Sequence, residues 1–571
     1  RGVVSNAMYD YYCPGYEDSA PLGHNTVCLL VEVASVRVAS PVTVPAGDLR
    51  GGQQGLPDYR PLINFPDPWP GGLWTLRDIV DYDLTAVRGL LTAVTRYRAS
   101  IVRNFYDMGL RAVEAGRRGG PFAFVIPPAQ HDPQAAAQLR ELLLRGHIEI
   151  HRAIEAFRAD GETYPAGSDI ILLAQPYRAY VKTLLERQRY PGPIGRTGTA
   201  ERPYDVTGWT LPLQMGVDVR AIERPFETPS LSRVTTGAPE RAPVLGERRP
   251  GHFIVDARGT AGLFAVSRLI AAGVPISWTV APRDVGGFTY APGSLIVSRS
   301  RASEATVARI AAEVGLRADG LRGPAPRDLP RIGRARVGLY APWLENTSEG
   351  WMRWAFDRYG LPYTTVRDAD IRRGGLRGRF DAIVIPSVPA DRLVDGNPAA
   401  EFPEAYVGGL GDSGLAALRA FVNEGGTLVA LEQAGELVIK TFNLPVRDVV
   451  RSEETFFGPG SLVRLNLDPQ SPLAFGMPPR TAAFFAFSAA YEGSGPDVAT
   501  VARYGSEDVL LSGYLVGEGL IAGRGAVIQA KVGTGHVVLV GFPPHHRGQS
   551  LATFRILFNA VLMTPGPDRT R

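Results

Sequence analysis

Cysteine and lysine are scarce in this chain, and each scarcity excludes a class of site. The 571 residues contain 2 cysteines, Cys13 and Cys28. Neither lies in a CxxC or Cys/His spacing, so a zinc ribbon is excluded, and the pair either forms a disulfide in an oxidising compartment or fills two small apolar sites. Lysine occurs only at positions 182, 440 and 531, so the formal charge of +4 comes from arginines scattered among acids. Nucleic-acid binding needs clustered positive charge, so no nucleic-acid partner is expected.

Long apolar runs are also missing. No stretch is apolar over the roughly 18 residues that a transmembrane helix needs, so no such helix is predicted. The hydrophobic share of 45% and the charged share of 21% are those of an ordinary globular protein, and 571 residues are too many for one core. The sequence starts RGVVSNAMYDYY, without an initiator methionine or a signal-peptide core. This start predicts that the first domain begins upstream of residue 1.

The order of elements predicts a multidomain α/β protein. After residues 1–45, a Pro/Gly-rich connector and a long amphipathic helical segment occupy 46–120, where Thr75 and Asp78 make a capping box. A doubly wound α/β domain is expected over 331–565, because strands such as RVGLYAP, FDAIVIPS and GHVVLVGF alternate with helices.

Between these parts, residues 121–330 contain an internal repeat. The strand–helix–glycine–strand pattern of 121–153 recurs in 251–279. Each copy continues into a nearly matching turn and strand, TYPAGSDIILL in the first and TYAPGSLIVS in the second. The recurrence predicts a duplicated α/β unit.

One carboxylate stands in an apolar run near the start. VCLLVEVA, residues 27–34, predicts a buried strand, and Glu32 is the charge within it. A carboxylate buried in this way needs a partner charge, a metal ion or a raised pKa. Two interpretations follow: Glu32 is a functional group beside a metal, or it points outward at a strand edge or pairs with Arg37.

The surrounding MYDYYCPGYEDSAPLGHNTVCLLVEVASVR resembles the end of the catalytic domain of the carboxypeptidase A-like zinc carboxypeptidases. The resemblance implies that residues 1–45 end such a domain. It makes Glu32 the general base that takes a proton from zinc-bound water, and Tyr9 a substrate contact, with Tyr11 and Tyr12 as competitors.

The family's zinc ligands precede this segment, so Zn²⁺ would be held upstream of residue 1. None of the 8 histidines here is expected to hold a metal. The implied function is peptide-bond hydrolysis at peptide C-termini in a longer parent, with a peptide as the partner and this chain inactive alone. Family members are commonly exported, so a secreted or periplasmic location is expected.

The last domain resembles the class I glutamine amidotransferase-like fold without its nucleophile. Active members carry a cysteine on a sharp strand-to-helix turn, whereas GGTLVALEQAGELVIK places Glu432 or Gln433 there, and no cysteine follows Cys28. Thiolate chemistry is therefore excluded.

Near the end of the chain, GFPPHHRGQS stands where active members carry a His-x-Glu pair. We expect Glu432, His545, His546 and Arg547 to form a polar cluster at the carboxyl edge of the sheet. The tryptophans of APWLENTSEGWMRW either wall a cleft there or pack a helix on the sheet. The alternative function is accordingly a non-catalytic ligand- or peptide-binding protein built on this domain.

Overall fold

Two units make up the chain, and each is described by itself. The computed structural model describes residues 2–4, 13–15, 19–36, 39–51, 56–190, 203, 205–239, 242–451 and 455–562. The first unit comprises 1–119, 173–183 and 203–205, and the second comprises 120–172, 184–202 and 206–571. Within the described ranges, no helix is long and apolar enough to cross a membrane.

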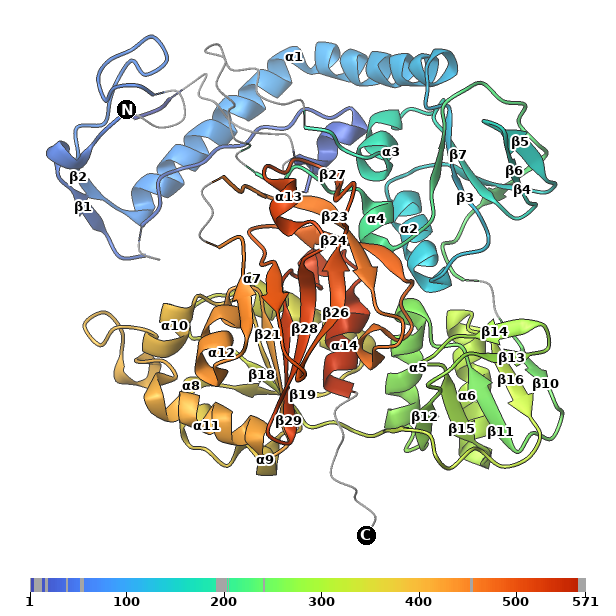
Figure 1. Cartoon of the computed structure of the whole chain (residues 1–571). Coiled ribbons are helices and arrows are strands. Elements are labelled where there is room, and N and C mark those ends of the chain that lie inside the picture. Colours follow the sequence, from blue (N-terminus) through green and yellow to red (C-terminus); the bar gives the residue numbers. More distant parts are fainter. Residues whose placement is uncertain are drawn as a thin grey trace. The chain divides into compact units, whose positions relative to one another are not determined.

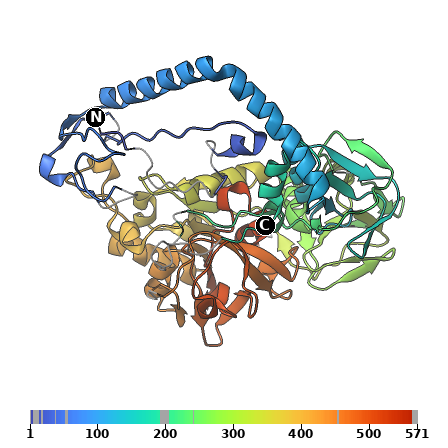
Figure 2. The same cartoon turned by 90° about the horizontal axis from the view of Figure 1, so that it is seen from above.

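A single helix, α1 (Leu76–Arg118), dominates the first unit and bends along its length (Figure 2). The Thr75 hydroxyl accepts a hydrogen bond from the N–H of Asp78, and the Asp78 carboxylate accepts one from the N–H of Thr75. The capping box expected from the sequence is therefore confirmed. The unit's other elements are η1 (Ala20–His24), β1 (Val42–Val44), η2 (Ala46–Asp48), β2 (Gly72–Trp74) and most of α3 (Arg178–Leu185).

The buried strand predicted for residues 27–34 is wrong. These residues form no strand, and Leu29 and Val31 are 61% and 52% exposed. The described contact of the segment is one hydrogen bond, from the indole N–H of Trp74 to the carbonyl of Ala34. A strand needs a neighbour to satisfy its backbone groups, and no described residues of this unit supply one here.

The second unit contains the duplication. In the first copy, the strands follow the order β8-β3-β7-β4-β9, and every pair is antiparallel. In the second copy, β16-β11-β15-β12-β17 repeats this order with the same directions, and β10 is added at the edge. Because chain order, sheet order and strand direction all match, the expected duplication is confirmed (Figure 1).

The elements of the two copies have the following bounds. The first copy consists of β3 (Ala123–Ile126), α2 (Pro133–Arg145), β4 (Ile150–Ala153), the hairpin β5 (Phe157–Ala159) and β6 (Glu162–Tyr164), β7 (Asp169–Leu172), α4 (Leu211–Met215), β8 (Arg220–Ile222) and β9 (Leu231–Val234). The second consists of β10 (Val244–Gly246), β11 (His252–Val255), α5 (Gly259–Ala271), β12 (Ile276–Trp278), the hairpin β13 (Arg283–Val285) and β14 (Phe288–Tyr290), β15 (Leu295–Ser298), α6 (Arg301–Val314), β16 (Ala318–Leu321) and β17 (Arg331–Ile332).

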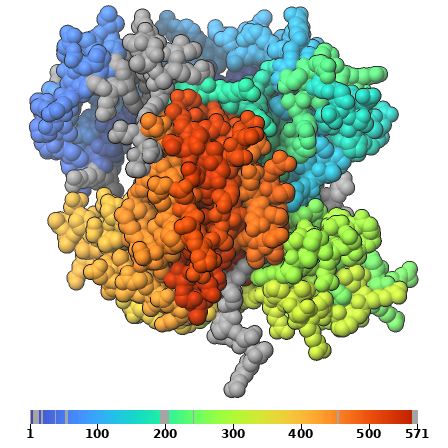
Figure 3. Space-filling model, in the orientation of Figure 1, coloured from blue at the N-terminus to red at the C-terminus, as the bar shows by residue number. Residues whose placement is uncertain are grey.

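The C-terminal domain is built on one large sheet. Its parallel half has the order β19-β18-β20-β21-β29, and an antiparallel half continues through β28, β26, β23 and β24. In Figure 3, residues of this antiparallel half, in orange and red, cover much of the face in view. The strands are β18 (Val337–Tyr340), β19 (Tyr363–Val366), β20 (Ala382–Ile385), β21 (Thr427–Leu431), β22 (Val446–Asp448), β23 (Ser461–Leu467), β24 (Arg480–Phe485), β25 (Tyr491–Gly493), β26 (Val498–Tyr504), β27 (Leu510–Ser512), β28 (Gly525–Val532) and β29 (Gly535–Val540).

Helices cover both faces of the parallel half. Ile383, Leu428 and Leu539 belong to the core that α11 and α12 complete. Their neighbours along the strands, such as Val429 and Val538, point to the opposite face and are equally buried, and α14 packs there. The domain is therefore doubly wound, as expected. Its helices are α7 (Thr347–Tyr359), α8 (Asp368–Arg372), α9 (Leu376–Arg379), α10 (Ala390–Asp395), η3 (Glu404–Tyr406), α11 (Gly411–Asn423), α12 (Ala434–Phe442), η4 (Pro472–Ala474), α13 (Glu518–Ile521), η5 (His546–Gly548) and α14 (Phe554–Leu562).

Candidate functional site

Glu432 occupies the sharp turn between β21 and α12. Its φ of 47° lies in the left-handed region, which costs a residue other than glycine about 1–3 kcal/mol. The turn is held by two backbone hydrogen bonds: the N–H of Glu432 donates to the carbonyl of Val540 at 2.7 Å, and the N–H of Gly435 donates to the carbonyl of Glu432 at 3.0 Å. Glu432, rather than Gln433, is therefore the apex residue. Strain of this kind is typical of functional sites.

Two serines from neighbouring loops line the same edge. Ser387 follows β20, and Ser348 lies in the first turn of α7, which follows β18. The N–H of Ser387 donates to the hydroxyl of Ser348 at 3.3 Å. Asn346 caps α7 by accepting from the N–H of Glu349, and its amide donates to the carbonyl of Ser387 at 2.9 Å. The carboxyl ends of β18, β20 and β21 therefore meet in one hydrogen-bonded edge.

The Glu432 carboxyl is protonated at neutral pH. Burial raises its pKa to about 8, and a hydrogen bond from the Ser387 hydroxyl opposes part of this rise. The residue as a whole is half-buried. A neutral carboxyl can donate a hydrogen bond, which a carboxylate cannot.

His545, in the loop after β29, is fixed to Ser348. Its Nε2 lies 2.7 Å from the carbonyl oxygen of Ser348 and 3.3 Å from the hydroxyl oxygen. Because the shorter contact is to a carbonyl, which only accepts, Nε2 carries the hydrogen. Burial lowers the pKa of this imidazole to about 4. With its Nε2 already protonated, His545 cannot take a proton from Ser348, so the pair is not a hydrolytic dyad.

The expected four-residue cluster forms only in part. Glu432 and His545 are linked through Ser387 and Ser348, but His546 turns away and stacks on Phe484 with ring centroids 3.5 Å apart. Burial lowers the pKa of His546 to about 3, so it stays neutral. His546 leaves the expected cluster because it stacks on Phe484 of β24. The sequence around the histidines does not indicate this contact.

The three tryptophans of this segment lie in two groups. Trp343 is 40% exposed; the Arg367 guanidinium lies 4.1 Å above its ring, and Tyr406 packs edge-on at 4.8 Å. Arg367 also donates to the carbonyls of Ala341 and Pro342, just after β18, so this group borders the carboxyl edge.

Trp351 and Trp354 lie on α7 with their rings 5.8 Å apart, and Trp354 faces Phe554 of α14. These contacts support the interpretation that the two tryptophans pack α7 on its neighbours, and Trp354 is still 39% exposed.

Sequence reasoning missed Tyr491, which lies behind the turn. Its side chain is 2% exposed, and its hydroxyl has no hydrogen-bond partner among the described residues. A Cβ on Gly435 would lie 2.7 Å from this hydroxyl. The glycine three positions after the apex was the available signal, since it leaves room for a side chain of another strand.

The residues expected from the carboxypeptidase resemblance lie elsewhere. Glu32 is exposed on the segment that forms no strand, and Tyr9 lies outside the described residues. In the described part of the chain, no three His, Cys, Asp or Glu side chains are grouped to hold a metal ion. The roles of Glu32, Tyr9 and Zn²⁺ stay predictions that depend on ligands outside this sequence.

Comparisons with known proteins give only distant likenesses. No protein-family model matches the sequence, and no curated protein is significantly similar to it. Among solved structures, a ThuA-like protein of Bacteroides uniformis is 10% identical with a TM-score of 0.26, over 40% of this chain and 91% of that one. PurLQS of Thermotoga maritima is 16% identical with a TM-score of 0.29, over 40% and 98%. A beta-galactosidase of Bacillus circulans is 13% identical with a TM-score of 0.26, over 40% and 31%. Likenesses this weak carry no conclusion about activity.

Proposed function

We propose that the C-terminal domain binds a small amide-containing ligand, such as a short peptide, at the carboxyl edge of its sheet. The protonated carboxyl of Glu432 donates a hydrogen bond to a carbonyl oxygen of the ligand. The observation that carries this proposal is Glu432 itself, a strained apex residue at the carboxyl edge of the sheet whose pKa is raised to about 8 by burial.

Three further features support binding rather than catalysis. The turn carries no thiol, since no cysteine follows Cys28. His545 is neutral and already donates its Nε2–H, so the edge lacks a general base for Ser348. Trp343 and Tyr406 offer exposed aromatic surface at the same edge, which suits an amide with apolar substituents.

The test is the pH dependence of binding of N-acetyl-dialanine amide, followed by NMR chemical-shift changes between pH 6 and 10. Wild-type affinity should fall as pH rises through about 8, because the carboxylate can no longer donate. Glu432→Gln keeps a donor and should bind at every pH without this fall. Glu432→Ala should bind at least tenfold more weakly than the wild type at pH 6, and its affinity should not change with pH.

Glu436→Gln is the matched control, because Glu436 lies on α12, just after the turn, but pairs with Lys440 and Arg451. It should behave as the wild type. Binding that ignores both pH and Glu432→Ala would refute the proposal.

A further inference from the structure

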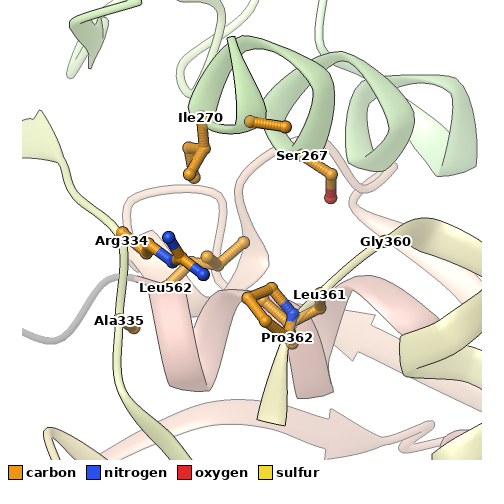
Figure 4. Close-up of a pocket in the computed structure, with 9 residues that line it drawn as sticks. Ser267, Ile270, Arg334, Ala335, Gly360, Leu361, Pro362 and Leu562 are labelled. Carbon is orange, nitrogen blue, oxygen red and sulfur yellow. The ribbon is translucent and has the colours of Figure 1, made fainter. Parts of the chain in front are cut away.

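A second site lies away from the Glu432 turn, where α5 of the second copy meets the C-terminal domain. A hollow of about 320 Å³ opens there, lined by the last turns of α5 and α14, the loop between α7 and β19, and the linker into β18 (Figure 4). Its walls are mostly apolar and include Ile270, Leu361, Pro362 and Leu562. The volume is at the small end of the range for ligand pockets, and junctions between domains are common places for them.

Two polar side chains reach into this hollow. Figure 4 shows the Arg334 guanidinium and the Ser267 hydroxyl directed toward the same space. Neither has an ion-pair or hydrogen-bond partner among the residues that the structure describes. Neighbouring arginines differ in this respect, since Arg336 is paired with Asp381 and Arg268 with Glu313. Two unused donors over apolar walls suit a ligand with an acceptor head and an apolar body.

Two opposing electrostatic effects decide whether the polar group of the ligand is negatively charged: the carboxyl ends of two helices and the guanidinium of Arg334. The carboxyl ends of α5 and α7 lie on the rim, and each acts as roughly half a negative charge. Some of the carbonyls in their last turns already accept hydrogen bonds, from the N–H groups of Ala272 and Val274 on α5 and of Leu361 on α7. Arg334 carries a full positive charge and can bind a carboxylate through two parallel hydrogen bonds, so a carboxylate is favoured there despite the helix ends.

We infer that this hollow binds a carboxylate attached to a short apolar body, with Arg334 and Ser267 holding the carboxylate and Ile270, Leu361, Pro362 and Leu562 covering the rest. Two sources share this chemistry: a medium-chain fatty acid, and the C-terminal apolar residue of a peptide. The inference does not depend on the ligand proposed for Glu432.

The experiment measures binding of two probes by isothermal titration calorimetry on the full chain. Octanoate represents the fatty acid, and N-acetyl-leucine represents the peptide end, with octanol and N-acetyl-leucine amide as uncharged controls. One acid should bind at least tenfold more tightly than its uncharged control, and the acid that does so identifies the source.

Arg334→Gln should weaken binding of that acid about tenfold while leaving its uncharged control unchanged. Ala271→Phe, on the lining, should block the acid by filling the hollow. Arg331→Gln is the matched control, because Arg331 is also exposed, lies on β17 and does not line the hollow. It should leave affinity within twofold.

Failure of both acids to bind, or binding that Arg334→Gln leaves intact, would overturn the inference. If Ala271→Phe does not fold, Arg334→Gln decides, since the Arg334 side chain is exposed and its loss leaves the core unchanged. Glu432→Ala should leave binding of the acid unchanged, which separates this site from the one proposed above.

Discussion

Asp132 joins the two copies of the repeated unit by hydrogen-bonding Thr260. Its Oδ2 accepts from the N–H of Thr260 at 2.6 Å and from the Thr260 hydroxyl at 2.8 Å. Its Oδ1 accepts from the N–H groups of Gln134 and Ala135, both at 3.1 Å. One carboxylate, 5% exposed, therefore caps α2 of the first copy and binds the first turn of α5 in the second.

Asp132→Ala should lower the free energy of unfolding by about 2–4 kcal/mol, because it leaves donors on two helix ends without an acceptor. Urea denaturation followed by circular dichroism measures the change. Asp218→Ala is the control, since Asp218 is exposed and pairs with the exposed Arg220, and it should change stability by less than about 0.5 kcal/mol. Equal effects of the two variants would show that the copies are held together by other contacts.

The ionisation of Glu432 should make stability fall as pH rises. In the folded state its pKa is about 8, against an ordinary value of 4.5, so between these values the native state keeps a proton that the unfolded state has released. Its stabilising contribution is complete below pH 4.5 and is lost as pH rises toward 8. Glu432→Gln has no such proton.

The difference in Tm between Glu432→Gln and the wild type should therefore grow in favour of the variant from about pH 5 to 8 and level off above. Differential scanning calorimetry across that range measures it. A difference that is constant with pH would mean that Glu432 ionises normally in the folded protein.

Substitutions at Gly435 and Tyr491 should have strongly non-additive effects on the free energy of unfolding. A Cβ at position 435 would lie 2.7 Å from the Tyr491 hydroxyl, closer than such atoms approach, so Gly435→Ala should destabilise the domain by about 1–3 kcal/mol. Tyr491→Phe removes a buried hydroxyl that has no described partner and should be neutral or stabilising by about 1 kcal/mol.

In the double variant Gly435→Ala/Tyr491→Phe, the alanine should lower the free energy of unfolding much less than it does in the wild-type background. A double-mutant cycle from urea denaturation measures this coupling. Additive effects would mean that the helix shifts away from the tyrosine instead.

The features that the sequence predicted correctly depend on residues close together in the chain. The capping box of α1 depends on Thr75 and Asp78 alone, and a sharp turn at Glu432 or Gln433 follows from an apolar strand running directly into a helix. The duplication was also readable, because both copies keep the same turn sequence.

The predictions that were wrong, and the contacts that were missed, depend on residues far away in the chain. Residues 27–34 have a strand's composition, but no described neighbour pairs with them, and composition cannot report a missing neighbour. His546 lies beside Phe484 and His545 beside Ser348 only because the sheet brings their loops together. The position of Tyr491 beside the turn could not be predicted for the same reason, although Gly435 indicates that a side chain packs there.

Glu32 tests the expected carboxypeptidase function. In a longer chain that supplies the zinc ligands implied by the resemblance, Glu32→Gln should abolish zinc-dependent hydrolysis of a peptide with a free C-terminus, by roughly a thousandfold or more, because the general base is lost. A peptide blocked at its C-terminus should not be cleaved by either protein. Tyr9→Phe should weaken hydrolysis by roughly tenfold, as expected for one lost substrate hydrogen bond.

Because Glu32 is exposed, its substitution should not affect folding. Because its side chain lies in solvent, Glu32→Gln should change the free energy of unfolding by less than about 0.5 kcal/mol, so any loss of hydrolysis reports chemistry rather than folding. Ser35→Ala, three residues away and also exposed, should keep full activity. Hydrolysis that survives Glu32→Gln would remove the residue from the mechanism, and the Glu432 edge would then be the place in this chain where function has a structural basis.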